Sequence, residues 1–324
     1  MNNKLVSIAM ATYNGEKYLR EQLDSIFNQS YNNIEVIVCD DCSTDNTLKI
    51  LEEYSNQYGL IYFINEQNLG YVKNFERVIS LCSGDFIALS DQDDIFLKDK
   101  IKILLEEIDD NDVIHTDAIL IDKNGDKISN SYSHYSKKLV GPKSEIELVL
   151  NGCVTGCTCM MTKKFAKNII PFPNNLYVHD KWIGFVAYKC DSLKYLDIPL
   201  IKYRQHSSNN IGATDVNSYS FLNKIKQVIF NKTDNNKLRT QILNQLNFTT
   251  IVLEKFNNDL KDKTKIHMIK EYYNNLLNGK NLFKTLYIFI KLFKYFELNK
   301  PIKYRLGFFI NTIRIIILKK ATIK

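Results

Sequence analysis

The stretch FIALSDQDD, residues 86–94, decides the fold class of this chain. Four apolar residues typical of a buried strand run directly into Ser90 and three carboxylates, Asp91, Asp93 and Asp94. In parallel α/β sheets, ligands bind just beyond the carboxyl ends of the strands, and polar residues gather there. The stretch therefore predicts a strand of such a sheet and a candidate functional site at its end.

The same pattern extends outward over the first 120 residues, where short apolar runs alternate with longer helical patterns. This alternation is the βαβ signature of a mostly parallel, doubly wound α/β sheet. Strands are expected at residues 6–11, 34–39, 61–64, 86–89 and 113–115, and helices at 16–28, 44–58, 72–80 and 99–108.

The rest of the chain carries fewer strand signals. Residues 125–142 lack periodicity, which predicts a loop. A helix is expected to begin at Ser144, because Glu147 follows it at capping-box spacing. Residues 221–318 show helical patterns, and Asn, Gly and Ser cluster at 211–220. We therefore expect an α/β domain over residues 1–215 and a helical region over 216–324.

Composition and charge exclude several classes of protein. The 324 residues are 45% hydrophobic and 24% charged, which is typical of a globular chain and not of a disordered or collagen-like one. The net charge of +7 is uneven: residues 280–324 contain eleven Lys and Arg against one Glu, so they carry +10 and the rest carries −3. No nucleic-acid-binding motif accompanies the basic residues, so we expect no nucleic-acid partner.

The chain has seven cysteines, and its first residues do not form a charged-then-apolar leader. Together these features predict reduced thiols and a cytoplasmic location. No apolar run of about 18 residues is free of charge, so no transmembrane span is expected. An apolar stripe between Leu306 and Ile317, with Lys and Arg beside it, predicts a helix lying in the inner face of the plasma membrane. Packing of this stripe against the rest of the protein is the alternative.

The acidic cluster at residues 91–94 suggests a metal ion, because carboxylates this close repel one another unless a cation lies among them. Oxygen ligands suit Mg²⁺ or Mn²⁺, which usually also coordinate substrate phosphates. A solvated acidic turn before the next helix is the alternative. Asp40 and Asp41 follow the second strand and could accept from a base or a ribose. The chain has no GxGxxG or GxxxxGK[ST] motif, so neither a dinucleotide fold nor a P-loop is expected.

Four blocks occur in order: VSIAMATYNG at residues 6–15, VCDDCSTDNT at 38–47, NLG at 68–70 and SDQDDI at 90–95. Together they resemble inverting glycosyltransferase family 2, which has the GT-A fold. The resemblance covers about two thirds of the chain, residues 4–212. It implies a metal-dependent enzyme that moves a sugar from a nucleotide-diphosphate sugar to a hydroxyl group. The matched roles are Thr12 and Tyr13 beside the base, Asp40 and Asp41 on the base and ribose, Asp91 and Asp93 on the metal, and Asp94 at the donor or the acceptor.

The sequence HDKW at residues 179–182 resembles the acceptor-side block of the family, in which an Asp is the catalytic base. Asp180 would then remove the acceptor hydroxyl proton as the oxygen attacks the anomeric carbon. A helix N-cap is the alternative role for Asp180. Trp182 could stack on a sugar ring or belong to the core.

Two further blocks resemble the rhamnosyltransferase-like subgroup. NGCVTGCT at residues 151–158 is similar to a loop that closes over the donor sugar, which implies donor contacts for Gly156 and Cys157. The cysteines around it lack the usual zinc-ligand spacing. YRQHSSN at 203–209 is similar to a block whose Arg and His approach the diphosphate and the metal, which implies those roles for Arg204 and His206. An ordinary surface strand end is the alternative.

The chain also departs from the wider family. The QxxRW block of processive synthases is absent, which favours a single transfer per acceptor. Cys42 stands where Gly is commoner, so its φ is expected to be one that a side chain tolerates. We expect a rhamnosyl donor first and galactose or glucose next, as a dTDP- or UDP-sugar, with a lipid-linked glycan as acceptor. A sugar-phosphate nucleotidyltransferase and an inactive nucleotide-sugar-binding protein are the alternatives.

Overall fold

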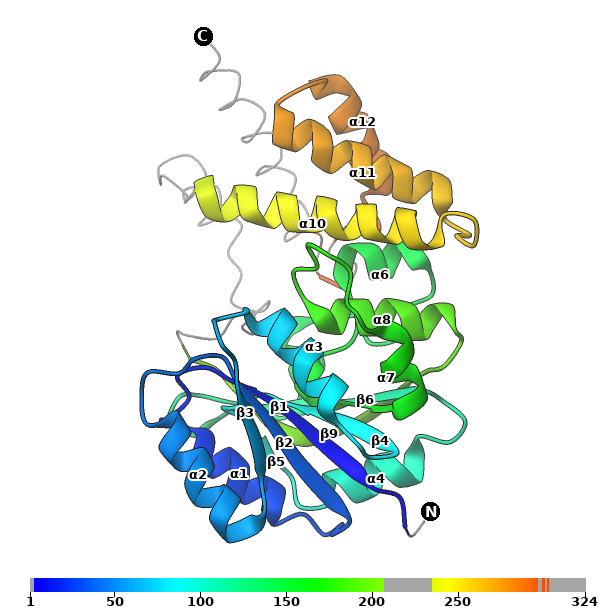
Figure 1. Ribbon diagram of the computed structural model, residues 1–324. Coiled ribbons are helices and arrows are strands. Elements are labelled where there is room, and N and C mark those ends of the chain that lie inside the picture. Colours follow the sequence, from blue (N-terminus) through cyan, green and yellow to red (C-terminus); the bar gives the residue numbers. More distant parts are fainter. Residues whose placement is uncertain (1–2, 207–234, 297–298, 301, 303–324) are drawn as a thin grey trace. The chain divides into compact units, whose positions relative to one another are not determined.

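The structure is a computed structural model that describes residues 3–206, 235–296, 299–300 and 302 (Figure 1). The predicted domain boundary at residue 215 and the apolar stripe from Leu306 to Ile317 lie outside these residues. Contacts divide the chain into two compact units. The first contains residues 1–134, 154–172 and 178–213, and the second contains 135–153, 173–177 and 214–324.

The first unit is built on one nine-stranded sheet with the order β3-β2-β1-β4-β8-β6-β9-β5, and β7 pairs with β6. All five predicted strands are present and confirm the predicted α/β sheet. The strands are β1 (Val6–Thr12), β2 (Ile34–Asp40), β3 (Ile61–Ile64), β4 (Phe86–Ser90), β5 (Ile95–Phe96), β6 (Val113–Ile121), β7 (Lys127–Ser129), β8 (Cys159–Thr162) and β9 (Leu193–Arg204).

The half of the sheet from β3 to β4 is entirely parallel. Chain order reverses direction at β1, and right-handed crossovers therefore place the helices on both faces. This explains why β1 is buried along nearly its whole length. The other half is mixed: β8 runs antiparallel between β4 and β6, whereas β6 and β9 are parallel.

Helices cover both faces of the sheet (Figure 1). The four predicted helices are confirmed, each within a few residues of its expected bounds. The helices of this unit are α1 (Leu19–Phe27), α2 (Thr47–Tyr58), α3 (Tyr71–Leu81), α4 (Lys100–Glu107), α7 (Lys163–Ile169) and α8 (His179–Lys189).

The prediction of a loop over residues 125–142 is wrong in part. β7 pairs with β6, and α5 (Tyr132–Ser136) follows. Both elements are too short to show a period in the sequence. The helix predicted after Ser144 exists as α6 (Glu145–Asn151), but the capping box is absent. Ser144 Oγ has no hydrogen-bond partner, and Glu147 accepts from the Lys143 backbone N–H at 2.8 Å.

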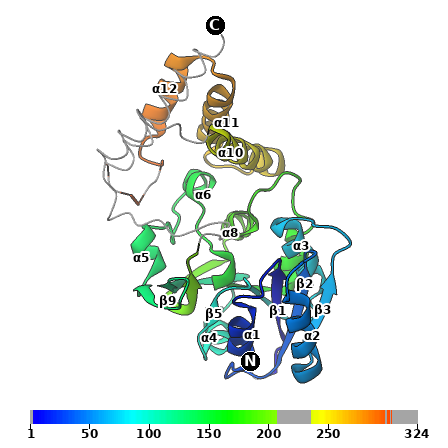
Figure 2. The same cartoon turned by 90° about the vertical axis from the view of Figure 1, so that its left-hand side faces the viewer.

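The second unit is helical in the residues that the structure describes, which confirms the predicted helical C-terminal region. Besides α6 it contains α10 (Asn235–Phe256), α11 (Lys263–Asn278) and α12 (Leu282–Leu292) (Figure 2). Gln245 of α10 donates to the Val149 carbonyl of α6, and the Asp262 N–H donates to Glu145 at 2.9 Å. Within the described part of the chain, no helix combines the length and the apolar character needed to cross a membrane.

Candidate active site

The predicted site residues lie in the first unit, at the carboxyl ends of β1, β2, β4 and β9, in the turn before β8 and in the first turn of α8. On the nucleotide side, Thr12 Oγ1 donates to Asp40 Oδ1 at 2.8 Å. The Ser43 N–H and hydroxyl donate to the same buried carboxylate at 2.8 and 2.6 Å. A carboxylate offers about four acceptor positions, so roughly one remains on Asp40 for a ligand.

Asp41 organises the neighbouring turn. Its buried carboxylate accepts from Asn65 Nδ2 at 2.6 Å, from the Leu69 N–H at 2.7 Å and from the Gly70 N–H at 2.9 Å. Gly70 adopts φ +79°, which glycine tolerates without strain. The NLG block noted in the sequence is therefore the partner that positions Asp41.

The expectation for Cys42 is wrong, because its φ is +65°, in the left-handed region. The backbone turns sharply here after β2, and Cys42 Sγ donates to the Asn65 carbonyl at 3.1 Å. A side chain in this region costs about 1–2 kcal/mol, which explains why glycine is commoner at this position.

Gln92 joins the nucleotide side to residues 91–94 between β4 and β5, which we call the acidic loop. Its Oε1 accepts from the Tyr13 N–H at 2.9 Å, and its Nε2 donates to the Tyr13 carbonyl at 3.1 Å. A Cβ on Gly15 would collide with Gln92 Oε1, so a larger residue at position 15 would have to displace the Gln92 side chain from Tyr13. The Tyr13 ring stays exposed and is available to a planar ligand.

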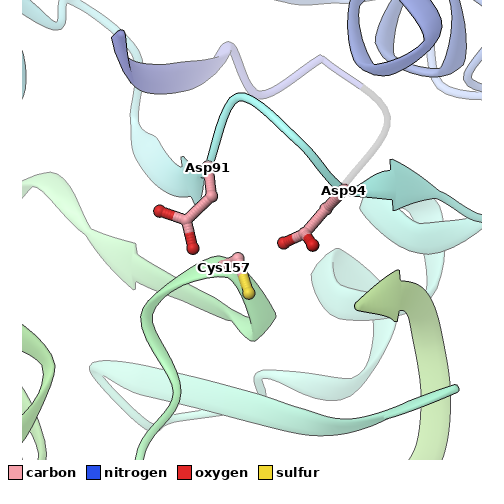
Figure 3. Close-up of side chains that lie close together, drawn as sticks. All are labelled: Asp91, Asp94 and Cys157. Atoms are coloured by element: carbon pink, nitrogen blue, oxygen red, sulfur yellow. The ribbon is translucent and has the colours of Figure 1, made fainter. Parts of the chain in front are cut away.

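Asp91 and Asp94 of the acidic loop face Cys157, which lies in the turn before β8, and the ligand atoms of the three side chains lie within 4.8 Å of one another (Figure 3). Burial, with help from Asp93 and Asp180, raises the pKa of Asp91 to about 7. Burial and the carboxylates of Asp93 and Asp91 raise the pKa of Asp94 well above its usual range. Asp94 Oδ2 is buried without a hydrogen-bond partner. Ionising these carboxylates is therefore costly without a cation, and a divalent cation among them would offset that cost.

Cys157 is a poor ligand for Mg²⁺ or Mn²⁺, because these ions prefer hard oxygen ligands. Burial and the nearby carboxylates raise the pKa of its thiol, so the sulfur stays protonated. Interaction with this thiol lowers the pKa of each carboxyl group and so offsets part of the rise.

Asp93 and His206 form the part of the cluster that is open to solvent. Asp93 Oδ2 lies 2.7 Å from His206 Nε2, and each side chain is 14% exposed. Carboxylate and imidazole groups are suitable ligands for Mn²⁺. The residues present therefore fit a divalent cation at Asp93 and His206, with Asp91 beside them.

Arg204 holds this loop in place. Its backbone N–H donates to Asp94 Oδ1 at 3.0 Å, and its Nε donates to the Asp93 carbonyl at 2.9 Å. The guanidinium also pairs with Glu21 and lies 4.6 Å from the Tyr18 ring centre. Only 2% of Arg204 is exposed, which is the position of a supporting residue.

Lys100, at the start of α4, is a site residue that the sequence analysis missed. It is fully buried, and its Nζ donates to the Cys157 carbonyl at 2.6 Å. Burial lowers the pKa of Lys100 to about 8, although the carboxylates of Asp94 and Asp91 act in the opposite direction. Nothing in the sequence marked this lysine, because a lysine beside a helix start is normally exposed.

On the acceptor side, Asp180 lies in the first turn of α8, and Val178 occupies the N-cap position. The N-cap alternative for Asp180 is therefore wrong. Burial, together with Asp180 and Asp91, raises the pKa of Tyr71, so these two carboxylates lie near the same phenol.

His179, the neighbour of Asp180, is a buried neutral imidazole. Its ring stacks on Phe75 with centroids 4.2 Å apart, and burial lowers its pKa to about 4. A Cβ on Gly156 would lie 3.0 Å from His179 Nε2, a tight contact that would require the imidazole to shift by a few tenths of an ångström. Gly156 therefore allows close approach of its turn to the start of α8.

The sequence profile of Glycosyl transferase family 2 matches residues 7–169, about half of the chain. The chain belongs to this family. The dTDP-rhamnosyl transferase RfbG of Shigella flexneri is 34% identical over 239 residues, which are 68% of this chain and 78% of that protein.

A second relative is the UDP-Glc:alpha-D-GlcNAc-diphosphoundecaprenol beta-1,3-glucosyltransferase WfgD of Escherichia coli. It is 27% identical over 270 residues, which are 82% of this family 2 chain and all of that protein. The crystal structure of S. aureus TarS 1-349 in complex with UDP-GlcNAc matches 98% of this chain and 92% of its own, at 20% identity and a TM-score of 0.58. This likeness confirms the GT-A fold.

Trp182 of this glycosyl transferase lies in the core, which was the second of its two predicted roles. It is 5% exposed, and its Nε1 donates to the Ile169 carbonyl at 3.3 Å. Stacking on a sugar would require the ring to leave this position. A tryptophan two residues from a candidate base carries no sequence signal that separates the two roles.

Proposed function

We propose that this family 2 chain transfers one sugar from a dTDP- or UDP-sugar to a hydroxyl of a lipid-linked cell-surface glycan, with inversion at the anomeric carbon. Rhamnose is the sugar that we propose first. The observation that carries the proposal is the Asp93–His206 pair, whose ring nitrogen and carboxylate oxygen lie 2.7 Å apart, together with Asp91, whose pKa is raised by the charges of both Asp93 and Asp180. Such a transfer requires two parts: a pair of side chains that bind a metal ion at the leaving diphosphate, and a carboxylate that acts as the base.

The donor would lie across the carboxyl ends of the strands. Thr12, Tyr13 and the remaining acceptor positions of Asp40 and Asp41 would bind the nucleoside. Asp93 and His206, with Asp91, would hold Mn²⁺ or Mg²⁺, which as a Lewis acid stabilises the charge of the departing diphosphate. Asp94, Gly156 and Cys157 would line the sugar, and Arg204 would keep the acidic loop in position.

Asp180 would accept the proton of the acceptor hydroxyl. The oxygen then forms the new bond to the anomeric carbon while the bond to the diphosphate breaks. His179 is neutral at pH 7, because its pKa is about 4, so it adds no positive charge beside the base. The carboxylate of Asp180 is thus the acceptor-side group suited to this step.

The names of the two relatives support the choice of substrates. RfbG is a dTDP-rhamnosyl transferase, and WfgD acts on a diphosphoundecaprenol-linked acceptor. We therefore propose that the acceptor is held in a membrane and that the enzyme works at its cytoplasmic face.

The test is a panel of dTDP-rhamnose, UDP-glucose and UDP-galactose, each with Mn²⁺ or with a chelator. Melting temperature and transfer to a lipid-linked glycan are both measured. We expect one donor to raise the melting temperature only with metal and to be consumed with transfer. In Asp93→Asn the metal-dependent rise in melting temperature should disappear. A shift without any transfer or hydrolysis would indicate a binding protein, and no shift with any donor would refute the proposal.

A further inference from the structure

Helix α12 has two apolar faces, of which one is packed. Ile288, Phe289 and Leu292 are buried within the second unit. The Phe289 ring packs against Phe296 at 5.1 Å and Tyr272 at 6.1 Å between centroids. This buried face packs α12 into the second unit.

The opposite face of α12 is exposed. Phe283 is 87% exposed, Tyr287 55% and Ile290 68%. Their spacing of four and three residues aligns them along one side of the helix. Single exposed apolar residues are common, whereas an aligned set of large ones marks an interaction surface. We call Phe283, Tyr287 and Ile290 the exposed stripe.

Lysines border the exposed stripe. Lys284 and Lys291 lie on the flank of the helix, and Lys280 and Lys294 lie at its two ends; all four are exposed. No acidic residue occurs between Lys280 and Phe296. Among the described ion pairs, one acidic residue contacts these lysines: Glu271 of α11 pairs with Lys284. The surface is therefore apolar and cationic together.

We propose that the exposed stripe docks on an anionic lipid surface. Phe283, Tyr287 and Ile290 enter the boundary between headgroups and acyl chains, and the lysine side chains extend to lipid phosphates. This proposal rests on the proposed function, because it names the surface on which the lipid-linked acceptor is met.

Charge favours lipid over a second copy of this chain. Two copies paired through this face would bring their lysines together, because a two-fold interface uses the same patch on both partners. Like charges facing each other in an interface oppose association. An anionic leaflet complements both the lysines and the apolar side chains.

The test is co-sedimentation of the full chain with phosphatidylcholine vesicles that contain or lack phosphatidylglycerol. We expect binding only with phosphatidylglycerol. Phe283→Asp and Ile290→Asp should each weaken it by at least about tenfold. Lys291→Gln should weaken it about fivefold. The matched control is Ile128→Asp on β7, where the side chain is 43% exposed in the first unit. This control should bind like the wild type.

Each outcome decides the proposal. Vesicle binding that survives Phe283→Asp and Ile290→Asp, with unchanged melting temperature, overturns it. A dimer by light scattering that Phe283→Asp converts to monomer assigns the stripe to a second copy and also overturns it. Transfer to a water-soluble acceptor is measured in parallel. If a variant that has lost vesicle binding still catalyses this transfer, the result supports docking. If the wild type does not catalyse it, the result refutes the proposed function instead.

Discussion

The pKa of Asp91 gives a quantitative prediction about stability. Asp91→Asn removes a carboxylate that is costly to ionise in the metal-free protein, since burial and its acidic neighbours raise its pKa from 3.8 to about 7. Between these two values the folded state binds more protons than the unfolded state, so this group's contribution to stability falls as pH rises. The asparagine variant lacks this pH-dependent loss.

The size of the effect follows from the shift. A shift of about three pKa units at about 1.4 kcal/mol each gives an upper bound of about 4 kcal/mol. Asp91 is partly exposed, and solvent screening reduces the expected value to about 2 kcal/mol. With a chelator present, Asp91→Asn should match the wild type near pH 4 and exceed its free energy of unfolding by about 2 kcal/mol near pH 8.

The assay is urea unfolding of both proteins across this pH range, with a chelator and then with Mn²⁺. Taking the difference between the two proteins cancels other titrating groups such as His179 and Lys181, whose pKa values burial lowers to about 4 and about 7. Mn²⁺ should stabilise the wild type more than the variant. A difference that does not change with pH, or a variant less stable than the wild type near pH 8 with chelator, would refute the reasoning.

Three further predictions concern single residues. Asp180→Asn should leave donor affinity unchanged and reduce transfer by about 10² to 10⁴-fold; a loss below about tenfold in rate assays would point to another base. Trp182→Phe should lower the free energy of unfolding by about 1 kcal/mol, because the Ile169 carbonyl loses its donor, without changing KM; a raised KM for acceptor would favour sugar stacking instead. Cys42→Gly should be more stable than Cys42→Ala by about 1–2 kcal/mol in urea unfolding, since both lack the thiol and only alanine keeps the strained Cβ; equal stabilities would contradict the left-handed backbone at this position.

The parallel half of the sheet was predictable because its strands are continuous apolar runs separated by helical patterns. β8 escaped notice because it has four residues and is inserted antiparallel between strands far away in sequence. β9 is continuous but contains Pro199, and its pairing with β6 shifts register on either side of that residue. A strand that depends on a distant partner for its shape carries little local signal.

The candidate site shows the same limit. Polar residues at strand ends indicated Asp40, Asp41 and the acidic loop, because their position in a parallel sheet follows from the pattern. Their partners did not follow, since the Asn68–Gly70 turn reaches Asp41 only through the fold. Lys100 was missed for a related reason: its burial depends on the Cys157 turn, which packs over it from 57 residues away.

The bond from the Arg204 N–H to Asp94 has a consequence for how the chain is made. The two residues are 110 positions apart, and Arg204 also ends β9, the strand that pairs with β5. A ribosome completes β1 to β4 long before it reaches Arg204, so the parallel half can pair while the acidic loop still lacks its anchor. Long-range pairings of this kind form late and slowly. The acidic loop, where we propose that the metal binds, is therefore the last part of the first unit to be assembled during synthesis.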